Sequence, residues 1–235
     1  MIDYFTRAFI FDMDGTLVDN MRFHGEAWKA MLLENGIETD THAFLVKTAG
    51  KTNREIIPNF FKDATEERLL ELGLRKETIY RELFLPERRP IAGAIEFLET
   101  AKSLGVKMAV ATAAPIANME FVLDGLNLRR FFDAITTAAD VSNGKPNPEV
   151  FLKSAEKLGV EPKNCLVFED ALNGFEAALR AGMKSIGIAT VNSIEDILQL
   201  PSVVEAERDF SNLKPVELIE KYLPQAEEIV KGQNG

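Results

Sequence analysis

The chain has 235 residues, a formal net charge of −10 and one cysteine, Cys165, which lies in an apolar run. This length allows one large domain or a core with a smaller module. The negative charge argues against nucleic acid or an anionic membrane as the main partner, because both favour a basic face. A lone cysteine excludes an internal disulfide framework, and no apolar stretch approaches a signal peptide or a membrane span. We therefore expect a soluble protein of the reducing cytoplasm.

The first predicted element is a short buried strand, Ala8 to Phe11, which ends abruptly in the sequence Asp12-Met-Asp14-Gly15-Thr16. Two carboxylates spaced i and i+2, followed by glycine, point past the end of a sheet, where parallel α/β folds keep their sites. The alternative is an acidic turn with Gly15 at a position that needs positive φ.

Residues 18–88 are predicted to be helical throughout. An apolar stripe with helical period runs from Met21 to Leu32 and stops near Asn35-Gly36. Further helices are expected at about residues 42–48, 53–61 and 66–85, and a proline-flanked connector at 85–91.

From about residue 93 the pattern alternates between helix and strand, which is typical of a parallel sheet covered on both faces. Helices are expected at about 93–104, 117–126, 148–158 (with Asn147 as N-cap and Pro148 in the first turn) and 171–181, and strands at about 106–111, 134–137, 165–168, 185–189 and 203–206. The opening strand needs this block to form a sheet. Residues 1–17 and 89–235 are therefore predicted to form a Rossmann-like α/β core, with residues 18–88 inserted as an all-helical cap above the strand ends.

Polar residues also follow the later strands or lie in the loops after them. These are Thr112, Lys145 and the pair Glu169-Asp170. If the strands are parallel neighbours, these side chains converge with Asp12 and Asp14 at one edge of the sheet. Four crowded acids repel one another unless a cation joins them, and carboxylates without histidine or cysteine favour magnesium. Lys145 and Thr112 are then left to hold an anion.

This set of residues suits phosphoryl transfer. Asp12 would attack phosphorus, and Asp14 would protonate the leaving oxygen and later deprotonate water. Magnesium and Lys145 would neutralise charge on the transferring group, and Thr112 would donate a hydrogen bond to it. Each residue also has a simpler interpretation: a solvated loop lysine, a hydroxyl at a strand end, and an acidic cap for the helix that follows residue 170.

Four segments resemble the motifs of the haloacid dehalogenase superfamily: FDMDGT at 11–16, VAT at 110–112, GKPNPEVF at 144–151 and VFEDALNGFEAALRAGM at 167–183. The helical insertion is similar to the cap of the branch that contains β-phosphoglucomutase and small phosphatases. The resemblance implies the nucleophile Asp12, the acid and base Asp14, a phosphate site at Thr112, Ala113 and Lys145, and magnesium on Asp12, the Asp14 carbonyl and Asp170 with Glu169 close by.

Cap residues extend the likeness to the mutase branch. His24, in MRFHGEAW, could gate Asp14 or touch the leaving group, although a partly buried helix histidine is the alternative. The stretch Gly50-Lys51-Thr52-Asn-Arg54 is similar to the glycine-led specificity loop, with the arginine one residue further on. Lys76 is similar to the cap lysine that meets the distal end of a substrate, and its alternative is a solvated helix position. A nucleotide P-loop at Gly50-Lys51-Thr52 is rejected, because that motif needs glycine where Leu45 stands.

One departure favours hydrolysis over isomerisation. After Thr112 the chain reads Ala113-Ala114-Pro115, where the mutase resembles Ser-Ala-Ser-Lys. The absent serine and lysine would weaken the grip on a second phosphate. We therefore predict a magnesium-dependent phosphatase for a small phosphate ester such as a sugar phosphate. A β-phosphoglucomutase, a pyrophosphatase or phosphonate hydrolase, and a catalytically silent binding module stay open, as does the oligomeric state.

Overall fold

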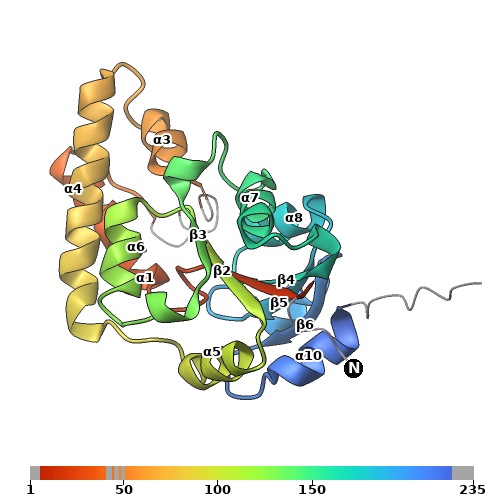
Figure 1. Ribbon diagram of the computed structural model, residues 1–235. Helices are drawn as coiled ribbons and strands as arrows, with labels where there is room; N and C mark the ends of the chain where they lie inside the picture. Colours follow the sequence, from red (N-terminus) through yellow and green to blue (C-terminus); the bar gives the residue numbers. More distant parts are fainter. Residues whose placement is uncertain (1–5, 41–43, 45–47, 49–50, 224–235) are drawn as a thin grey trace, which may run out of the picture.

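A computed structural model describes residues 6–40, 44, 48 and 51–223. In this part of the chain six parallel strands form one sheet in the order β3-β2-β1-β4-β5-β6 (Figure 1). The strands are β1 Ala8–Phe11, β2 Lys107–Ala111, β3 Ala134–Thr136, β4 Cys165–Glu169, β5 Lys184–Ile188 and β6 Val203–Glu207. The predicted Rossmann-like parallel sheet is thereby confirmed, including its last strand.

Helices cover both faces of the sheet, as the buried strands require. Side chains alternate along β1, so Phe9 and Phe11 face one layer while Ala8 and Ile10 face the other. The first layer contains α5 (Ala94–Ser103) and α10 (Pro215–Tyr222), and the second contains α7 (Glu149–Leu158) and α8 (Leu172–Arg180). A short helix, α9 (Ile194–Ile197), packs beside β5 and β6.

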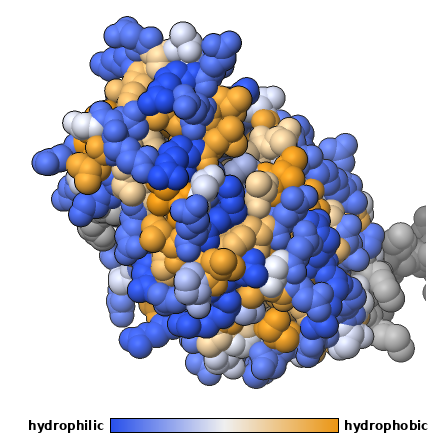
Figure 2. All heavy atoms as spheres, turned by 90° about the vertical axis from the view of Figure 1, so that its left-hand side faces the viewer, coloured by the Kyte–Doolittle hydropathy of each residue, from blue (hydrophilic) through white to orange (hydrophobic). Residues whose placement is uncertain are grey.

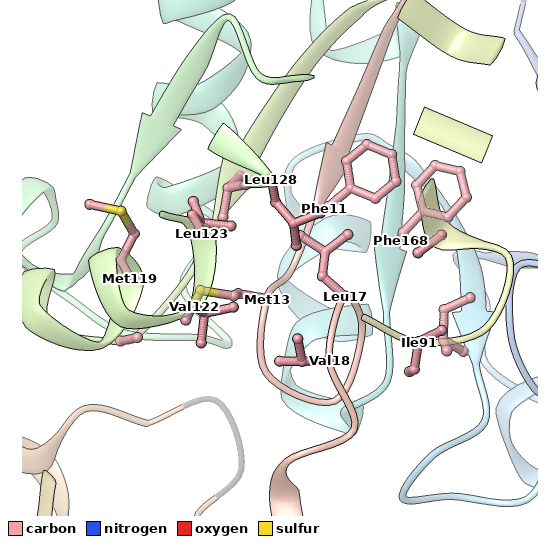
Figure 3. Close-up of a cluster of buried hydrophobic side chains, with 14 of the residues drawn as sticks. Phe11, Met13, Leu17, Val18, Ile91, Met119, Val122, Leu123, Leu128 and Phe168 are labelled. Atoms are coloured by element: carbon pink, nitrogen blue, oxygen red, sulfur yellow. The ribbon is translucent and has the colours of Figure 1, made fainter. Parts of the chain in front are cut away.

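Phenylalanine rings fix the ends of the two central strands. Phe11 and Phe168 stack with their centroids 4.6 Å apart, and Phe97 and Phe210 pack against both. Burying one such ring stabilises the fold by about 1.5–3 kcal/mol. The turn after β1 is anchored on its other side by α6 (Ile116–Leu123). Figure 3 shows Met13, Leu17 and Val18 of this turn in one cluster with Met119, Val122 and Leu123. The residues that follow Phe11 and Phe168 therefore start from strand ends that are held in place by packed side chains.

The described residues between Phe11 and Arg88 form helices and contribute no strand to the sheet. They form α1 (Met21–Glu34), α3 (Asn53–Ile56), a 3₁₀ turn (Ile57–Asn59), α4 (Glu66–Phe84) and a second 3₁₀ turn (Leu85–Glu87). These helices lie to the left of the sheet in Figure 1. α1 and α4 pack together, with the Phe23 and Phe84 rings 5.0 Å apart. The boundaries of a cap domain at 18 and 88 stay a prediction.

Several predicted helices differ from the observed ones. The helix expected at 53–61 is wrong beyond Ile56, because Pro58 has no backbone N–H to continue the hydrogen bonding. The helix expected at 42–48 lies mostly outside the described residues. α7 begins at Glu149 with Pro148 as its N-cap, so the expectation of Asn147 as N-cap is wrong. The Asn147 side chain still accepts a hydrogen bond from the backbone N–H of Glu149 at 3.0 Å.

The face that carries α4 shows hydrophobic residues scattered among hydrophilic ones (Figure 2). Leu70 and Leu74, one helical turn apart on α4, are both exposed. None of the helices in the described ranges has the length and apolar character needed to cross a bilayer.

Candidate active site

The register of the sheet brings three chemically important positions to one edge. Phe11 of β1 pairs with Val110 of β2 and with Phe168 of β4. The residues just beyond these positions therefore emerge side by side, as expected for parallel strands. The Asp12 N–H donates to the Phe168 carbonyl at 2.9 Å, which joins the start of the turn to β4.

A buried lysine links two buried carboxylates at this edge. Lys145 Nζ lies 2.6 Å from Asp12 Oδ1 and 2.6 Å from Glu169 Oε1. Burial alone would lower the pKa of Lys145, but the two carboxylates outweigh this effect and raise it. Burial raises the pKa of Asp12 well above its usual range, although Lys145 opposes the shift. The interpretation of Lys145 as a solvated loop residue is wrong.

The turn after β1 passes directly over Asp170. Gly15 has φ of 84°, and a Cβ atom there would lie 2.1 Å from Asp170 Oδ2. Only glycine fits, both in conformation and in space. The Thr190 hydroxyl holds the turn by donating to the Gly15 carbonyl at 2.6 Å, and the Asn192 side chain donates to the Asp170 carbonyl at 2.9 Å. The alternative interpretation, a turn with positive φ at Gly15, is therefore correct for the backbone. The predicted convergence of acids at the sheet edge is observed as well.

Three carboxylates form a cluster that suits a hard cation. Asp12, Glu169 and Asp170 each offer an oxygen, and these atoms all lie within 4.8 Å of one another. Asp170 Oδ2 is buried without a hydrogen-bond partner among the described residues. Burial and the neighbouring acids Glu169 and Asp12 raise the pKa of Asp170. An unpartnered oxygen and an all-carboxylate donor set fit a divalent cation of the magnesium type.

Glu169 is the least available of the three acids. Its Oε2 accepts the backbone N–H groups of Asp170 and Ala171, at 2.6 and 2.8 Å, while its Oε1 accepts from Lys145. These two N–H groups precede the first residue of α8, Leu172, so Glu169 fixes the backbone that leads into the helix and also contacts the lysine. The second carboxylate oxygen of Asp12 has no hydrogen-bond partner in the described part of the chain.

Asp14 lies apart from the cluster, on the side of the helical insertion. Its Oδ1 accepts a hydrogen bond of 2.6 Å from the Asn20 side chain and lies 3.6 Å from His24 Nε2. Asn20 also accepts from the Gly15 N–H at 3.1 Å, so it ties the acid to the turn. This position suits proton transfer, and metal binding through the Asp14 backbone carbonyl stays a prediction.

A pocket of about 100 Å³ opens over these groups. Its floor is lined by Asp12, Asp14, Thr112, Ala113, Ala114, Pro115, Glu169, Asp170 and Ala171 of the core. The Thr112 hydroxyl accepts from the Ala114 N–H at 3.0 Å, so its own proton is left to donate. Lys145 does not line the pocket, although it contacts Asp12, which does.

The helical insertion supplies the opposite wall of the pocket, through Met21, His24, Trp28, Thr48, Lys51, Asn53, Ile56, Lys76 and Glu77. Lys76 is buried, and its Nζ lies 2.9 Å from His24 Nδ1, so the interpretation of Lys76 as solvated is wrong. Lys51 is exposed at the rim.

Thr52 and Arg54 of the predicted specificity loop do not line the pocket, whereas Lys51 and Asn53 do. Thr52 instead forms a capping box with Glu55 at the start of α3, and Arg54 is exposed and outside the lining. Gly50 lies outside the described residues.

Sequence reasoning missed Asn20, Glu77 and Asn118. Glu77 accepts hydrogen bonds from Lys76 and, at 2.6 Å, from the Asn118 side chain of α6. A signal was present for Glu77, because it falls on the apolar stripe of α4 that includes Leu72 and Tyr80. Asn118 had no such signal, since a polar residue near a helix start is usually exposed.

The fold and the site define a Rossmann-like α/β protein with a lysine-linked acidic cluster at the carboxyl edge of its sheet, under a wall of inserted helices. A family model of the haloacid dehalogenase-like hydrolases matches residues 6–182. The chain belongs to this family, as the motifs predicted.

Curated relatives and solved structures agree with this family. The chain is 33% identical over 181 residues to the fructose-1-phosphate phosphatase YqaB of Escherichia coli strain K12, covering 76% of this chain and 94% of the relative. It is 34% identical over 196 residues to a phosphorylated carbohydrates phosphatase of Thermotoga maritima, covering 80% and 87%. A β-phosphoglucomutase structure from Clostridium difficile superposes with a TM-score of 0.80 at 30% identity, covering 92% and 96%. The predicted enzyme class, a hydrolase of phosphoric monoesters, agrees with the two phosphatase relatives.

Proposed function

We propose that this protein is a magnesium-dependent phosphatase that hydrolyses a sugar phosphate through an aspartyl-phosphate on Asp12. The observation that carries the proposal is the contact of Lys145 with both Asp12 and Glu169, beside the unpartnered oxygen of Asp170. Asp12 lines the pocket and Lys145 contacts its Oδ1, which would leave the other carboxylate oxygen for the substrate. The names of the Escherichia coli and Thermotoga relatives support a phosphorylated carbohydrate as the substrate class.

In the first step the free oxygen of Asp12 forms a bond to phosphorus, while the bond from phosphorus to the ester oxygen breaks. Asp14 donates a proton to the departing oxygen, which leaves as the sugar hydroxyl. In the second step Asp14 takes a proton from water, the water oxygen bonds to phosphorus, and the bond to Asp12 breaks to release inorganic phosphate. Asn20 holds Asp14 in place for both proton transfers.

Positive charge and hydrogen bonds would stabilise the transferring group. Lys145 offsets the negative charge of Asp12 and Glu169, and the Thr112 hydroxyl would donate to a phosphoryl oxygen. Asp12, Asp170 and the Asp14 carbonyl would hold the magnesium ion, with Glu169 beside them. When bound, this ion would neutralise the acids and the phosphoryl oxygens.

Residues 18–88 would act as a cap over this chemistry, with hinges near 17–19 and 86–90. The cap would exclude bulk water and select the substrate. The shared lining of the pocket by both parts supports this role, since His24 lies near Asp14 of the core turn.

A β-phosphoglucomutase is the second candidate, because a solved mutase superposes closely. A mutase must hold two phosphates at once. The stretch Ala113-Ala114-Pro115 lines the pocket of this chain with no side-chain donor for the second phosphate. Hydrolysis is therefore the better supported reaction.

The test compares the wild type with Asp12→Asn and with Asp63→Asn, an exposed acid that serves as control. Each is incubated with magnesium and a panel of esters that includes fructose 1-phosphate, pyrophosphate and β-glucose 1-phosphate with a bisphosphate primer. We expect phosphate release from sugar monophosphates by the wild type and the control, and none by Asp12→Asn. Isomerisation without phosphate release would identify a mutase, and inactivity of the wild type on every ester would indicate a binding module.

A further inference from the structure

Glu77 is a buried acid in the pocket that the proposed reaction does not use. Its side chain comes from α4, and the residue is only 5% exposed. It lies on the wall formed by the helical insertion, opposite the acidic cluster of the core. An ionisable group at such a position needs an explanation, because burying a charge is costly unless it is paired.

Glu77 accepts hydrogen bonds from three side chains at this end of the pocket. Its Oε1 accepts from Lys76 Nζ at 3.0 Å and from Asn53 Nδ2 at 2.8 Å, and its Oε2 accepts from Asn118 Nδ2 at 2.6 Å. Arg81 adds a further bond by donating to the Asn118 carbonyl oxygen at 2.7 Å. The lysine and the two amides would otherwise be free to bind an anionic group of a substrate.

The carboxylate is charged at neutral pH. Burial alone would raise the pKa of Glu77, but Lys76, His24 and the Asn53 side chain outweigh it and lower the pKa to about 2. The negative charge therefore pairs with that of Lys76, and both side chains are buried. Lys51 also lines the pocket, but it is exposed at the rim, where solvent and salt screen its charge.

We propose that Glu77 determines substrate specificity. It would exclude substrates that carry a second phosphate and would bind those whose distal end carries an uncharged hydroxyl group. A hydroxyl can donate to Oε2, which accepts only one hydrogen bond among the described residues. A phosphate at the same place would meet a fixed carboxylate, to which Lys76, Asn53 and Asn118 already donate. This inference rests on the proposed function and narrows its substrate class to sugar or polyol monophosphates.

The test compares fructose 1-phosphate with fructose 1,6-bisphosphate in the wild type, in Glu77→Gln and in Glu82→Gln. Glu82 is an exposed acid on the same helix, so its substitution removes the same charge outside the pocket. Values of kcat/KM are measured for both esters, and the affinity of each ester is measured by calorimetry on the same proteins. Calorimetry of the wild type also keeps the proposal testable if Glu77→Gln does not fold.

We expect the wild type to bind and hydrolyse the monophosphate at least about tenfold better than the bisphosphate, because the second phosphate would lie against the Glu77 carboxylate while Lys76 is already paired with Glu77. Glu77→Gln should reduce this ratio about tenfold or more, and Glu82→Gln should leave it unchanged. A wild type that binds the bisphosphate as well as the monophosphate would overturn the proposal, and so would equal losses for both esters in Glu77→Gln. Absence of turnover alone would count against the proposed phosphatase, while the calorimetric ratio would still decide the role of Glu77.

Discussion

The backbone of Gly174 lies directly against the carboxylate of Glu169: a Cβ atom on Gly174 would be 1.7 Å from Glu169 Oε1. That oxygen is the one that accepts from Lys145. The first turn of α8 therefore sets the position of the acid, and through it the position of the lysine behind Asp12.

Substituting Gly174→Ala should damage the site more than the fold. The added methyl group must displace Glu169, so we expect kcat to fall at least about tenfold and the free energy of unfolding to fall by about 1–3 kcal/mol, as is usual for overpacking. Enzyme assays with saturating magnesium and urea unfolding measure the two effects. Gly73→Ala in α4 is the control, because a Cβ atom there makes only ordinary contacts, the nearest at 3.4 Å. Unchanged activity in Gly174→Ala would show that Glu169 is not constrained by this contact.

The sheet and the acidic edge could be predicted from the sequence because local pattern and tertiary structure agree there. The run Ala8 to Phe11 is apolar throughout, as a strand buried on both faces requires, and its abrupt end at Asp12 marks the edge. Motif order then places Lys145 and Glu169 at the same edge. The parallel register brings these residues together, and it depends on the strands and not on the helical insertion.

The pocket wall that the helical insertion forms could not be predicted from the sequence in the same detail. Contacts such as that between Glu77 and Asn118 join residues 41 positions apart in the chain and depend on how α4 packs on α6. No local pattern encodes that packing. Arg54 illustrates the same limit, because a likeness to a specificity loop suggested a substrate contact, whereas its side chain is exposed outside the pocket.

Replacing Lys145 by methionine should inactivate the enzyme and destabilise it. The substitution keeps the aliphatic bulk but leaves the buried carboxylates of Asp12 and Glu169 without their shared cation. Removing one partner of a buried ion pair costs about 3–5 kcal/mol, and loss of a charge-stabilising donor lowers kcat by about 10²–10³. Phosphate release and urea unfolding without magnesium are the measurements. Lys62→Met, at an exposed position, should change neither quantity. A stable and active Lys145→Met would contradict the role assigned to this lysine.

Asp170→Asn should stabilise the metal-free protein and remove its response to magnesium. The wild type holds three acids within 4.8 Å against one lysine, and Asp170 Oδ2 has no partner in the described chain. Removing one negative charge should raise the metal-free stability by about 1–2 kcal/mol. Magnesium at about 100 times its Kd should stabilise the wild type by about 2.7 kcal/mol.

Thermal unfolding with EDTA and with excess magnesium measures both effects. Asp63→Asn should behave like the wild type in each condition. An equal magnesium response in Asp170→Asn would mean that the ion is held without this residue.

The ion pair of Glu77 should make stability depend on acid pH. The pKa of Glu77 lies at about 2 in the folded protein, below its ordinary value of 4.5. A lowered pKa means that the unfolded chain binds the proton first as the pH falls. The contribution of Glu77 is therefore complete above about pH 4.5 and is lost as the pH falls toward 2, and its full size is on the order of 3 kcal/mol.

Urea unfolding at a series of pH values from about 6 to about 3 should show this difference between the wild type and Glu77→Gln. The wild type should be more stable at neutral pH, because Glu77→Gln leaves Lys76 buried without its partner carboxylate. The gap should narrow as the pH falls below about 4.5, since protonation of Glu77 makes the wild type resemble the variant. Glu82→Gln should follow the wild type throughout, because its carboxylate is exposed. A gap that stays constant down to the lowest pH would mean that Glu77 stabilises the protein through its shape and hydrogen bonds, and that its charge contributes nothing.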